Sequence, residues 1–99
     1  MKKSKTVVTR TAYELAEALG LSPADGAEIE LRSDLNDKII SVVKSKGLTH
    51  AQVAKLAHTS RTRVTALMNH NAADISTDLM LRILASLGIR AKLQFKMAA

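Results

Sequence analysis

The sequence has no cysteine and very few aromatic residues. A chain without thiols forms no disulfide, no thiolate metal site and no cysteine nucleophile, and it does not require an oxidising compartment. The two aromatic residues, Tyr13 and Phe95, are too few to form the ring platforms on which single-stranded bases stack. Apolar runs extend for only a few residues, far short of the roughly 20 that cross a bilayer. We therefore expect a cytoplasmic protein that does not bind membranes.

Motifs of catalysis and metal binding are also missing. The sequence contains no glycine-rich phosphate loop and no motif that pairs a nucleophile with a base. The three histidines, His50, His58 and His70, are not spaced as i, i+4 pairs, and no acidic cluster nearby completes a tetrahedral set of ligands. We therefore expect no enzymatic activity, no cofactor and no metal ion.

The residues that are present have the composition of one globular domain. The chain has 99 residues, of which 46% are hydrophobic and 24% are charged, enough for a single core. Its net charge is +6 and its pI is about 10.0. A strongly basic chain favours a polyanionic partner such as nucleic acid, although a basic surface can equally serve solubility alone.

The charge is unevenly distributed along the chain. Residues 1 to 10 carry four positive charges and no acid, and we expect them to form a flexible basic N-terminus. Residues 11 to 37 hold seven of the nine acidic residues against a single arginine, and residues 38 to 99 are again basic. This asymmetry indicates either two surfaces for two kinds of partner or simply the solvated faces of helices.

The spacing of apolar residues predicts five helices. Ser or Thr residues that can cap a helix precede most of them, and glycines mark several of their ends. The expected helices cover residues 11 to 19, 23 to 46, 49 to 57, 60 to 69 and 77 to 87. Gly26 and Ser33 leave open whether residues 23 to 46 form one helix or two, because both residues are weak helix formers.

Residues 89 to 97 change to a period of two, which predicts a strand with one buried face. A lone strand leaves its backbone donors and acceptors unpaired, so it needs a partner. We predict that this partner is the same segment of a second copy rather than the short residues 6 to 9. The predicted dimer contacts are the alternating apolar residues Ile89, Ala91, Leu93, Phe95 and Met97.

Residues 49 to 69 form the most informative segment of the sequence. It contains two short predicted helices, and the break between them, His58 and Thr59 followed by the capping Ser60, makes the helices cross at a large angle. Val53 and Ala57 share one face of the first helix, and Val64 and Leu67 share one face of the second. The other side of the second helix is then free to enter a major groove. We predict that duplex DNA is contacted by His50, Gln52, Ser60, Arg61, Thr62, Arg63, Thr65, Ala66 and Asn69.

This segment resembles the helix-turn-helix of the XRE/Cro type. That pattern has Thr-Gln-x-x-Leu-Ala, a turn with Gly, and then Ser-x-x-x-Val/Ile-Ser-x-Leu/Ile. The matching residues are Thr49, Val53, Ala54, Ser60, Val64, Thr65 and Leu67, whereas His50 replaces the usual Gln and His58 the usual Gly. The resemblance implies a mainly α, five-helix, lambda-repressor-like domain over residues 11 to 99. Its helix-turn-helix core would span residues 34 to 88, with a dimerisation strand at 89 to 97.

Other short motifs resemble the HigA-type antitoxins within this family: Leu-Gly-Leu at residues 19 to 21 before Pro23, Lys-Gly-Leu-Thr at 46 to 49, and Leu87-Gly88 before the closing strand. That resemblance implies a repressor of its own operon that also neutralises a basic RelE/HigB-like ribonuclease toxin. The two-fold axis of the predicted dimer would make the operator palindromic. The candidate toxin contacts are Glu14, Glu17, Glu28 and Glu30. Two alternatives stay open: a phage-type stand-alone repressor, and a protein-interaction or ribonuclease-inhibitor module whose helix-turn-helix no longer binds DNA.

Overall fold

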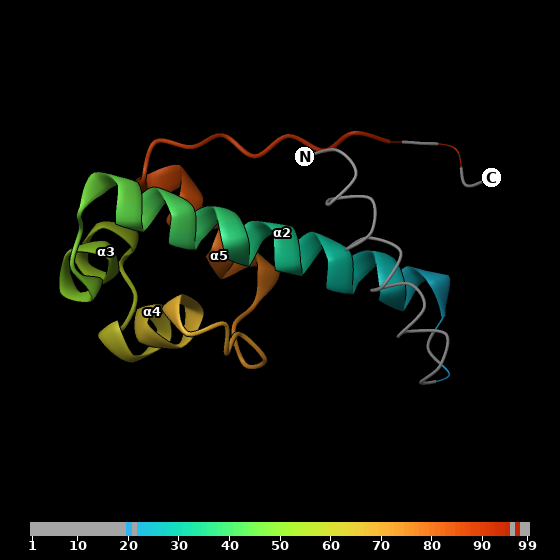
Figure 1. Ribbon diagram of the computed structural model, residues 1–99, viewed down its shortest axis with the longest axis horizontal. Coiled ribbons are helices and arrows are strands. Elements are labelled where there is room, and N and C mark those ends of the chain that lie inside the picture. The colour runs from blue at the N-terminus through green and yellow to red at the C-terminus, as the bar shows by residue number, and fades with distance from the viewer. Residues whose placement is uncertain (1–19, 21, 96, 98–99) are drawn as a thin grey trace. The chain divides into compact units, whose positions relative to one another are not determined.

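The computed structural model describes residues 20, 22–95 and 97 of the chain. This part contains the helices α2 (Pro23–Lys46), α3 (His50–Ala57), α4 (Arg61–Met68) and α5 (Thr77–Ser86) (Figure 1). The helix predicted over residues 11 to 19 and the basic N-terminus predicted over residues 1 to 10 lie outside the described residues. The structure divides within α2, between Leu35 and Asn36, into two compact units. That residues 11 to 99 form a single domain stays a prediction.

Helix α2 begins at a reciprocal cap made by Ser22 and Asp25. The Ser22 hydroxyl accepts from the Asp25 amide at 3.2 Å, and the Asp25 carboxylate accepts from the Ser22 amide at 3.0 Å. Pro23 follows the cap at the first helical position, where its missing N–H costs nothing. The 24 residues run without interruption to Lys46, so the segment that the sequence left undecided is one helix. Gly47, with a φ of 63°, ends it.

The three shorter helices confirm the helices predicted at 49 to 57, 60 to 69 and 77 to 87. The first two begin one residue later than predicted, because Thr49 and Ser60 cap them in extended conformation instead of joining them. Ser76 caps α5 as expected, with its hydroxyl accepting from the Leu79 amide at 3.1 Å.

The core of the second unit is formed by aliphatic side chains from all four helices. Helix α3 packs against both α4 and α5. The largest fully buried side chains are Ile39, Val43, Val53, Val64, Leu67, Met80, Ile83 and Leu84. Removing this apolar surface from water is the main force that holds the short helices, which are too short to be stable alone.

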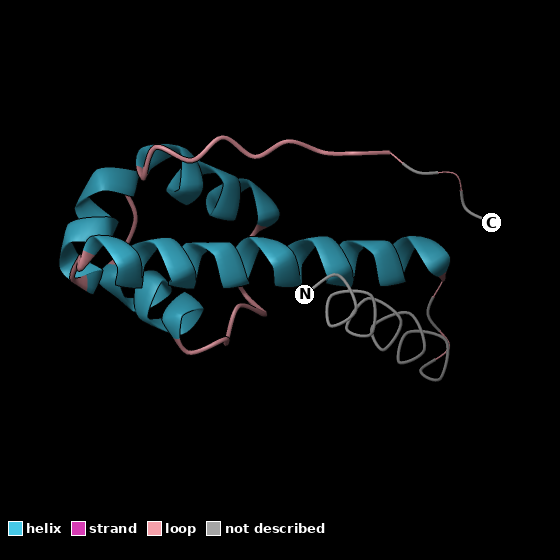
Figure 2. Ribbon diagram, turned by 45° about the horizontal axis from the view of Figure 1, so that its top comes forward, coloured by secondary structure: helices cyan, strands magenta, loops and turns pink. Residues whose placement is uncertain are grey.

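The predicted closing strand is absent from the described residues 89–95 and 97, which follow α5 as a chain without regular structure (Figure 2). The prediction of a strand there is therefore wrong for the single chain. A strand requires a neighbour to accept its backbone hydrogen bonds, and the described part of the chain supplies only helices. Of the five predicted dimer contacts, Ile89 is half-buried, and Ala91, Leu93, Phe95 and Met97 are exposed.

None of the described helices combines the length and the apolar character that crossing a membrane requires.

Candidate nucleic-acid interface

The interface begins at the turn that joins α3 to α4. His58 lies just beyond α3 with φ 55° and ψ 48°, in the left-handed region. Its amide donates to the Lys55 carbonyl at 3.4 Å, and the next amide, of Thr59, donates to the Ala54 carbonyl at 2.9 Å. These two bonds are those of a Schellman motif, in which the left-handed residue is usually glycine. His58 therefore makes the turn that the sequence predicted at this position, with a histidine in place of glycine.

The two faces of α4 differ sharply in exposure. Val64 and Leu67 are both 0% exposed and fix one face against the core. At 3.6 residues per turn, Thr62, Ala66 and Asn69 lie on the opposite face. Arg61 and Arg63 are exposed, and their positions are separated by about 160° around the helix axis, so the two guanidinium groups flank the outward stripe on either side.

All nine predicted DNA contacts are accessible to solvent. Three of them are half-buried, namely His50, Thr65 and Ala66. The remaining six are exposed: Gln52, Ser60, Arg61, Thr62, Arg63 and Asn69. Eight of the nine belong to α3, to α4 or to the cap of α4, and Asn69 is the residue that ends α4. Their contact with DNA stays a prediction.

A hydrogen bond joins two of these residues across the helix pair. The Nδ1 atom of His50, the first residue of α3, lies 2.8 Å from the Thr65 hydroxyl oxygen on α4. This bond leaves the second ring nitrogen, Nε2, for another partner. The Thr65 hydroxyl, which the sequence assigned to DNA, already has a partner inside the protein.

Two further side chains at the interface are committed to caps. The Ser60 hydroxyl accepts from the Arg63 amide at 3.2 Å, and Gln52 Oε1 accepts from the Thr49 amide at 2.8 Å. Gln52 keeps its amide N–H groups as donors. The groups that remain available in this part of the structure are therefore two guanidinium groups, the Thr62 hydroxyl, the Asn69 amide, the Gln52 amide N–H groups, the second ring nitrogen of His50 and small apolar surfaces. This is the mixture with which proteins contact phosphates and base edges in a major groove.

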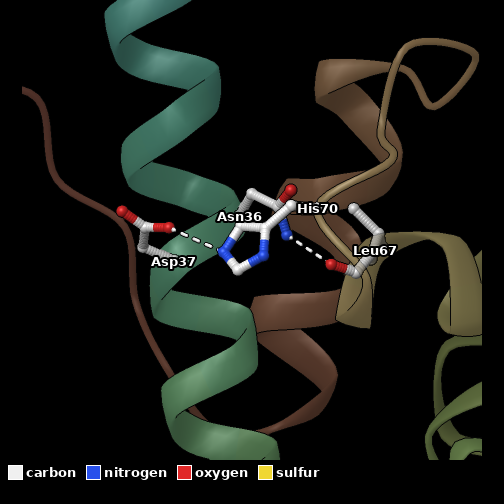
Figure 3. A network of polar contacts seen from close by, with 4 residues as sticks. All are labelled: Asn36, Asp37, Leu67 and His70. Carbon is white, nitrogen blue, oxygen red and sulfur yellow. Dashed lines mark hydrogen bonds and ion pairs between the residues drawn. The ribbon is translucent and has the colours of Figure 1, made fainter.

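Sequence reasoning missed Asn36, a residue of α2 that contacts the end of α4. Its side chain is 6% exposed, and its Nδ2 donates to the Leu67 carbonyl at 2.8 Å (Figure 3). The next residue, Asp37, places a carboxylate oxygen 3.5 Å from Nε2 of His70, just beyond α4. The available signal was a polar residue one turn before the buried Ile39 and Ile40, at a position where the spacing favours an apolar side chain.

The predicted toxin contacts are only partly described. Glu28 is exposed and Glu30 is half-buried, both on α2, whereas Glu14 and Glu17 lie outside the described residues. Among the residues that the structure describes, no three histidine, aspartate or glutamate side chains gather in a way that could hold a metal ion.

Comparison with known proteins agrees with the geometry of α3 and α4. The sequence model of the helix-turn-helix domain family matches residues 13–96, which is most of the chain. No curated protein and no solved structure matches this chain. A match of this extent includes the two crossed helices, their turn and the helices on either side. The chain therefore belongs to the helix-turn-helix domain family.

Proposed function

We propose that this protein is a sequence-specific regulator of transcription that binds double-stranded DNA with α4 in the major groove and acts as a repressor. The observation that carries the proposal is the division of α4 into two faces. Val64 and Leu67 are fully buried on one face, while Arg61 and Arg63 are exposed beside the other. Burial of the first face fixes which side chains the second presents to a partner.

The dimensions and chemistry of α4 suit a duplex. An α-helix with its side chains is about 10–12 Å across, which matches the width of the major groove of B-DNA. Arginine pairs with guanine or with phosphate, and the methyl group of Ala66 can contact the methyl group of thymine. Gln52, in the first turn of α3, retains its side-chain N–H donors for the phosphate backbone, because it is its Oε1 that accepts from the Thr49 amide. Nε2 of His50, in the same turn, is a donor in the tautomer in which the Thr65 hydroxyl donates to Nδ1.

The test is a gel-shift titration with the DNA upstream of the gene for this protein. Replacing Arg61 and Arg63 together by Ala should weaken binding, because each specific guanine contact contributes about 1–3 kcal/mol. The slope of log affinity against log salt should become shallower by about 0.9 for each phosphate that the variant no longer neutralises.

The matched control replaces Arg82 and Arg90 by Ala, which removes the same charge from exposed positions outside the helix pair. This control should lose much less affinity than the Arg61 and Arg63 double variant. Equal losses of affinity in the two double variants would show that Arg61 and Arg63 contribute only through the net charge of the protein. Unchanged affinity in the α4 variant, with an unchanged circular dichroism spectrum, would refute the assignment and favour a protein-interaction module.

A narrower proposal is that the regulator is the antitoxin of a toxin–antitoxin pair. The support is the resemblance to HigA-type sequences together with the exposed acids of α2, such as Glu28 and Asp34. A basic ribonuclease of the RelE/HigB type would meet complementary charge there, and such charge speeds association and makes it sensitive to salt. A phage-type stand-alone repressor would lack such a partner.

This narrower proposal predicts slower association with a RelE/HigB-like ribonuclease after Glu14, Glu17, Glu28 and Glu30 are changed to Gln. The reduction should shrink as salt is raised, because exposed charges are screened within about 8 Å at physiological ionic strength. Stopped-flow association rates measure it, with Asp74→Asn and Asp78→Asn as the control. Rates that respond neither to salt nor to the four substitutions would contradict an acidic docking surface.

A further inference from the structure

Among the described residues, Asn36 is the one polar residue that is buried as a whole. It lies on α2 beside the buried Leu35 and one turn before Ile39 and Ile40. Burying an amide in such surroundings is unfavourable unless the amide finds a hydrogen-bond partner. Asn36 has one, because its Nδ2 donates to the Leu67 carbonyl at 2.8 Å.

The partner of Asn36 belongs to the last turn of α4. The Leu67 carbonyl also accepts from the His70 amide at 3.1 Å, so it would keep a hydrogen bond if Asn36 were apolar. The amide is therefore not needed to satisfy that carbonyl. The bond instead fixes the position of α4, because it holds the last turn of α4 against one point of α2. Buried polar contacts of this kind often serve to select one arrangement rather than to add stability.

Asp37 adds a second contact at the same end of α4. Its carboxylate lies 3.5 Å from His70 Nε2, and His70 has a left-handed backbone with φ 57° (Figure 3). Both side chains are about two-thirds exposed, at 65% and 64%, so solvent weakens this contact. Of the two consecutive contacts from α2, the buried one made by Asn36 is the stronger constraint.

We infer that Asn36 is a positioning residue that sets the orientation of α4 for base recognition without itself touching DNA. The inference rests on the proposed function. Helix α4 is tied to α2 through Asn36 and Leu67, and to the start of α3 through Thr65 and His50 at 2.8 Å. In the proposed complex the contacts with base edges come from α4, whereas Gln52 on α3 offers its amide donors to phosphates. A shift of α4 against α2 and α3 therefore disturbs base contacts more than phosphate contacts.

The experiment measures the binding of the full chain to two duplexes of equal length, one with its upstream sequence and one unrelated. Asn36→Leu keeps the number and branching of the side-chain heavy atoms, replaces the amide by two bulkier methyl groups, and leaves the Leu67 carbonyl bonded to the His70 amide. We expect affinity for the upstream duplex to fall by about tenfold, the effect of one misplaced contact. Affinity for the unrelated duplex, and its salt dependence, should stay near the wild-type values.

A second variant and a control separate positioning from stability. Asn36→Ser is a smaller change whose hydroxyl can bond to the backbone of its own helix, and it should reduce the ratio of the two affinities in the same direction. Ile39→Val lowers the stability of the same core on the same helix without touching the Leu67 carbonyl. It should lower the melting temperature but preserve the ratio.

The outcomes distinguish this inference from the proposed function. If the wild-type protein binds both duplexes equally or not at all, the proposed function fails and the inference fails with it. If the wild type discriminates, and the folded Asn36 variants discriminate equally well, only the positioning role is overturned. Parallel losses on both duplexes, in proportion to the loss of stability and matched by Ile39→Val, would likewise overturn it.

Discussion

At the scale of single residues, the helix-turn-helix depends on a few polar atoms at the ends of helices. Thr49, Ser60 and Ser76 each accept the hydrogen bond of a backbone amide that would otherwise be unpaired. His58 and His70 both have left-handed backbones, with φ of 55° and 57°. A left-handed conformation costs a residue with a Cβ about 1–2 kcal/mol. Packing on both sides of each turn must offset that strain, so neither turn is set by local preference alone.

The turn between α3 and α4 contains Thr59, whose hydroxyl group leads to a prediction about stability. Its hydroxyl oxygen is buried and has no hydrogen-bond partner among the described residues. An unpaired buried hydroxyl is unfavourable, and valine has nearly the same shape without it. Thr59→Val should therefore raise the free energy of unfolding by about 1 kcal/mol, measured by urea denaturation. DNA affinity should not change.

The control for this substitution is Thr62→Val, the same chemical change at an exposed position of α4. It should leave the free energy of unfolding nearly unchanged, since a solvated hydroxyl loses little on removal. A decrease in stability after Thr59→Val would show that the hydroxyl has a partner in solution.

At the scale of helices, the sequence predicts what depends on near neighbours. The period of apolar residues and the caps at Thr49, Ser60 and Ser76 locate α3, α4 and α5 to within about one residue at their starts. The continuity of α2 was not predictable in the same way. Gly26 falls in its first turn and Ser33 is exposed, so neither residue breaks the helix. Helix propensity alone, however, would favour a break at both positions.

The contacts between helices were beyond sequence reasoning for a different reason. The bond from Asn36 to Leu67 spans 31 positions and that from His50 to Thr65 spans 15. Periodicity shows which face of a helix is buried, but it does not give the crossing angle or the atoms that meet there. The sequence therefore located the nine candidate residues on α3, on α4 and at its two caps, and their contact with DNA stays a prediction. The hydrogen bond between His50 and Thr65 could be found only in three dimensions.

The segment after α5 shows how a local pattern can mislead. Ile89, Leu93 and Phe95 alternate with polar residues as in a half-buried strand. The alternation of apolar and polar residues shows which side chains could share a buried face. A strand also needs a neighbouring backbone to pair with, and the sequence of one chain does not guarantee one. In the structure Leu93 is 61% and Phe95 92% exposed, so the apolar side of the pattern faces water.

At the scale of the whole molecule, that exposed segment leads to the proposal of a homodimer. Two copies of residues 89 to 97 can pair as antiparallel strands, which would cover the apolar side chains and satisfy the backbone groups together. A two-fold axis would present two copies of α4 to one face of DNA. The expected operator is then palindromic, with half-sites separated by about 34–36 Å, one turn of the duplex.

The dimer is tested by replacing Leu93 and Phe95 together by Ser, with Gln94→Ser as the control on the opposite side of the alternation. The full chain should sediment as a dimer at micromolar concentration, and so should the control. The double variant should be a monomer, because Ser at both positions removes two of the three large apolar side chains that the segment exposes. Its affinity for a palindromic operator should approach that of wild-type protein for a single half-site, since one copy of α4 reads only one half. Deleting residues 89–99 should have the same two effects.

A full chain that sediments as a monomer at this concentration would refute the proposed dimer, and binding to an operator would then require only one α4.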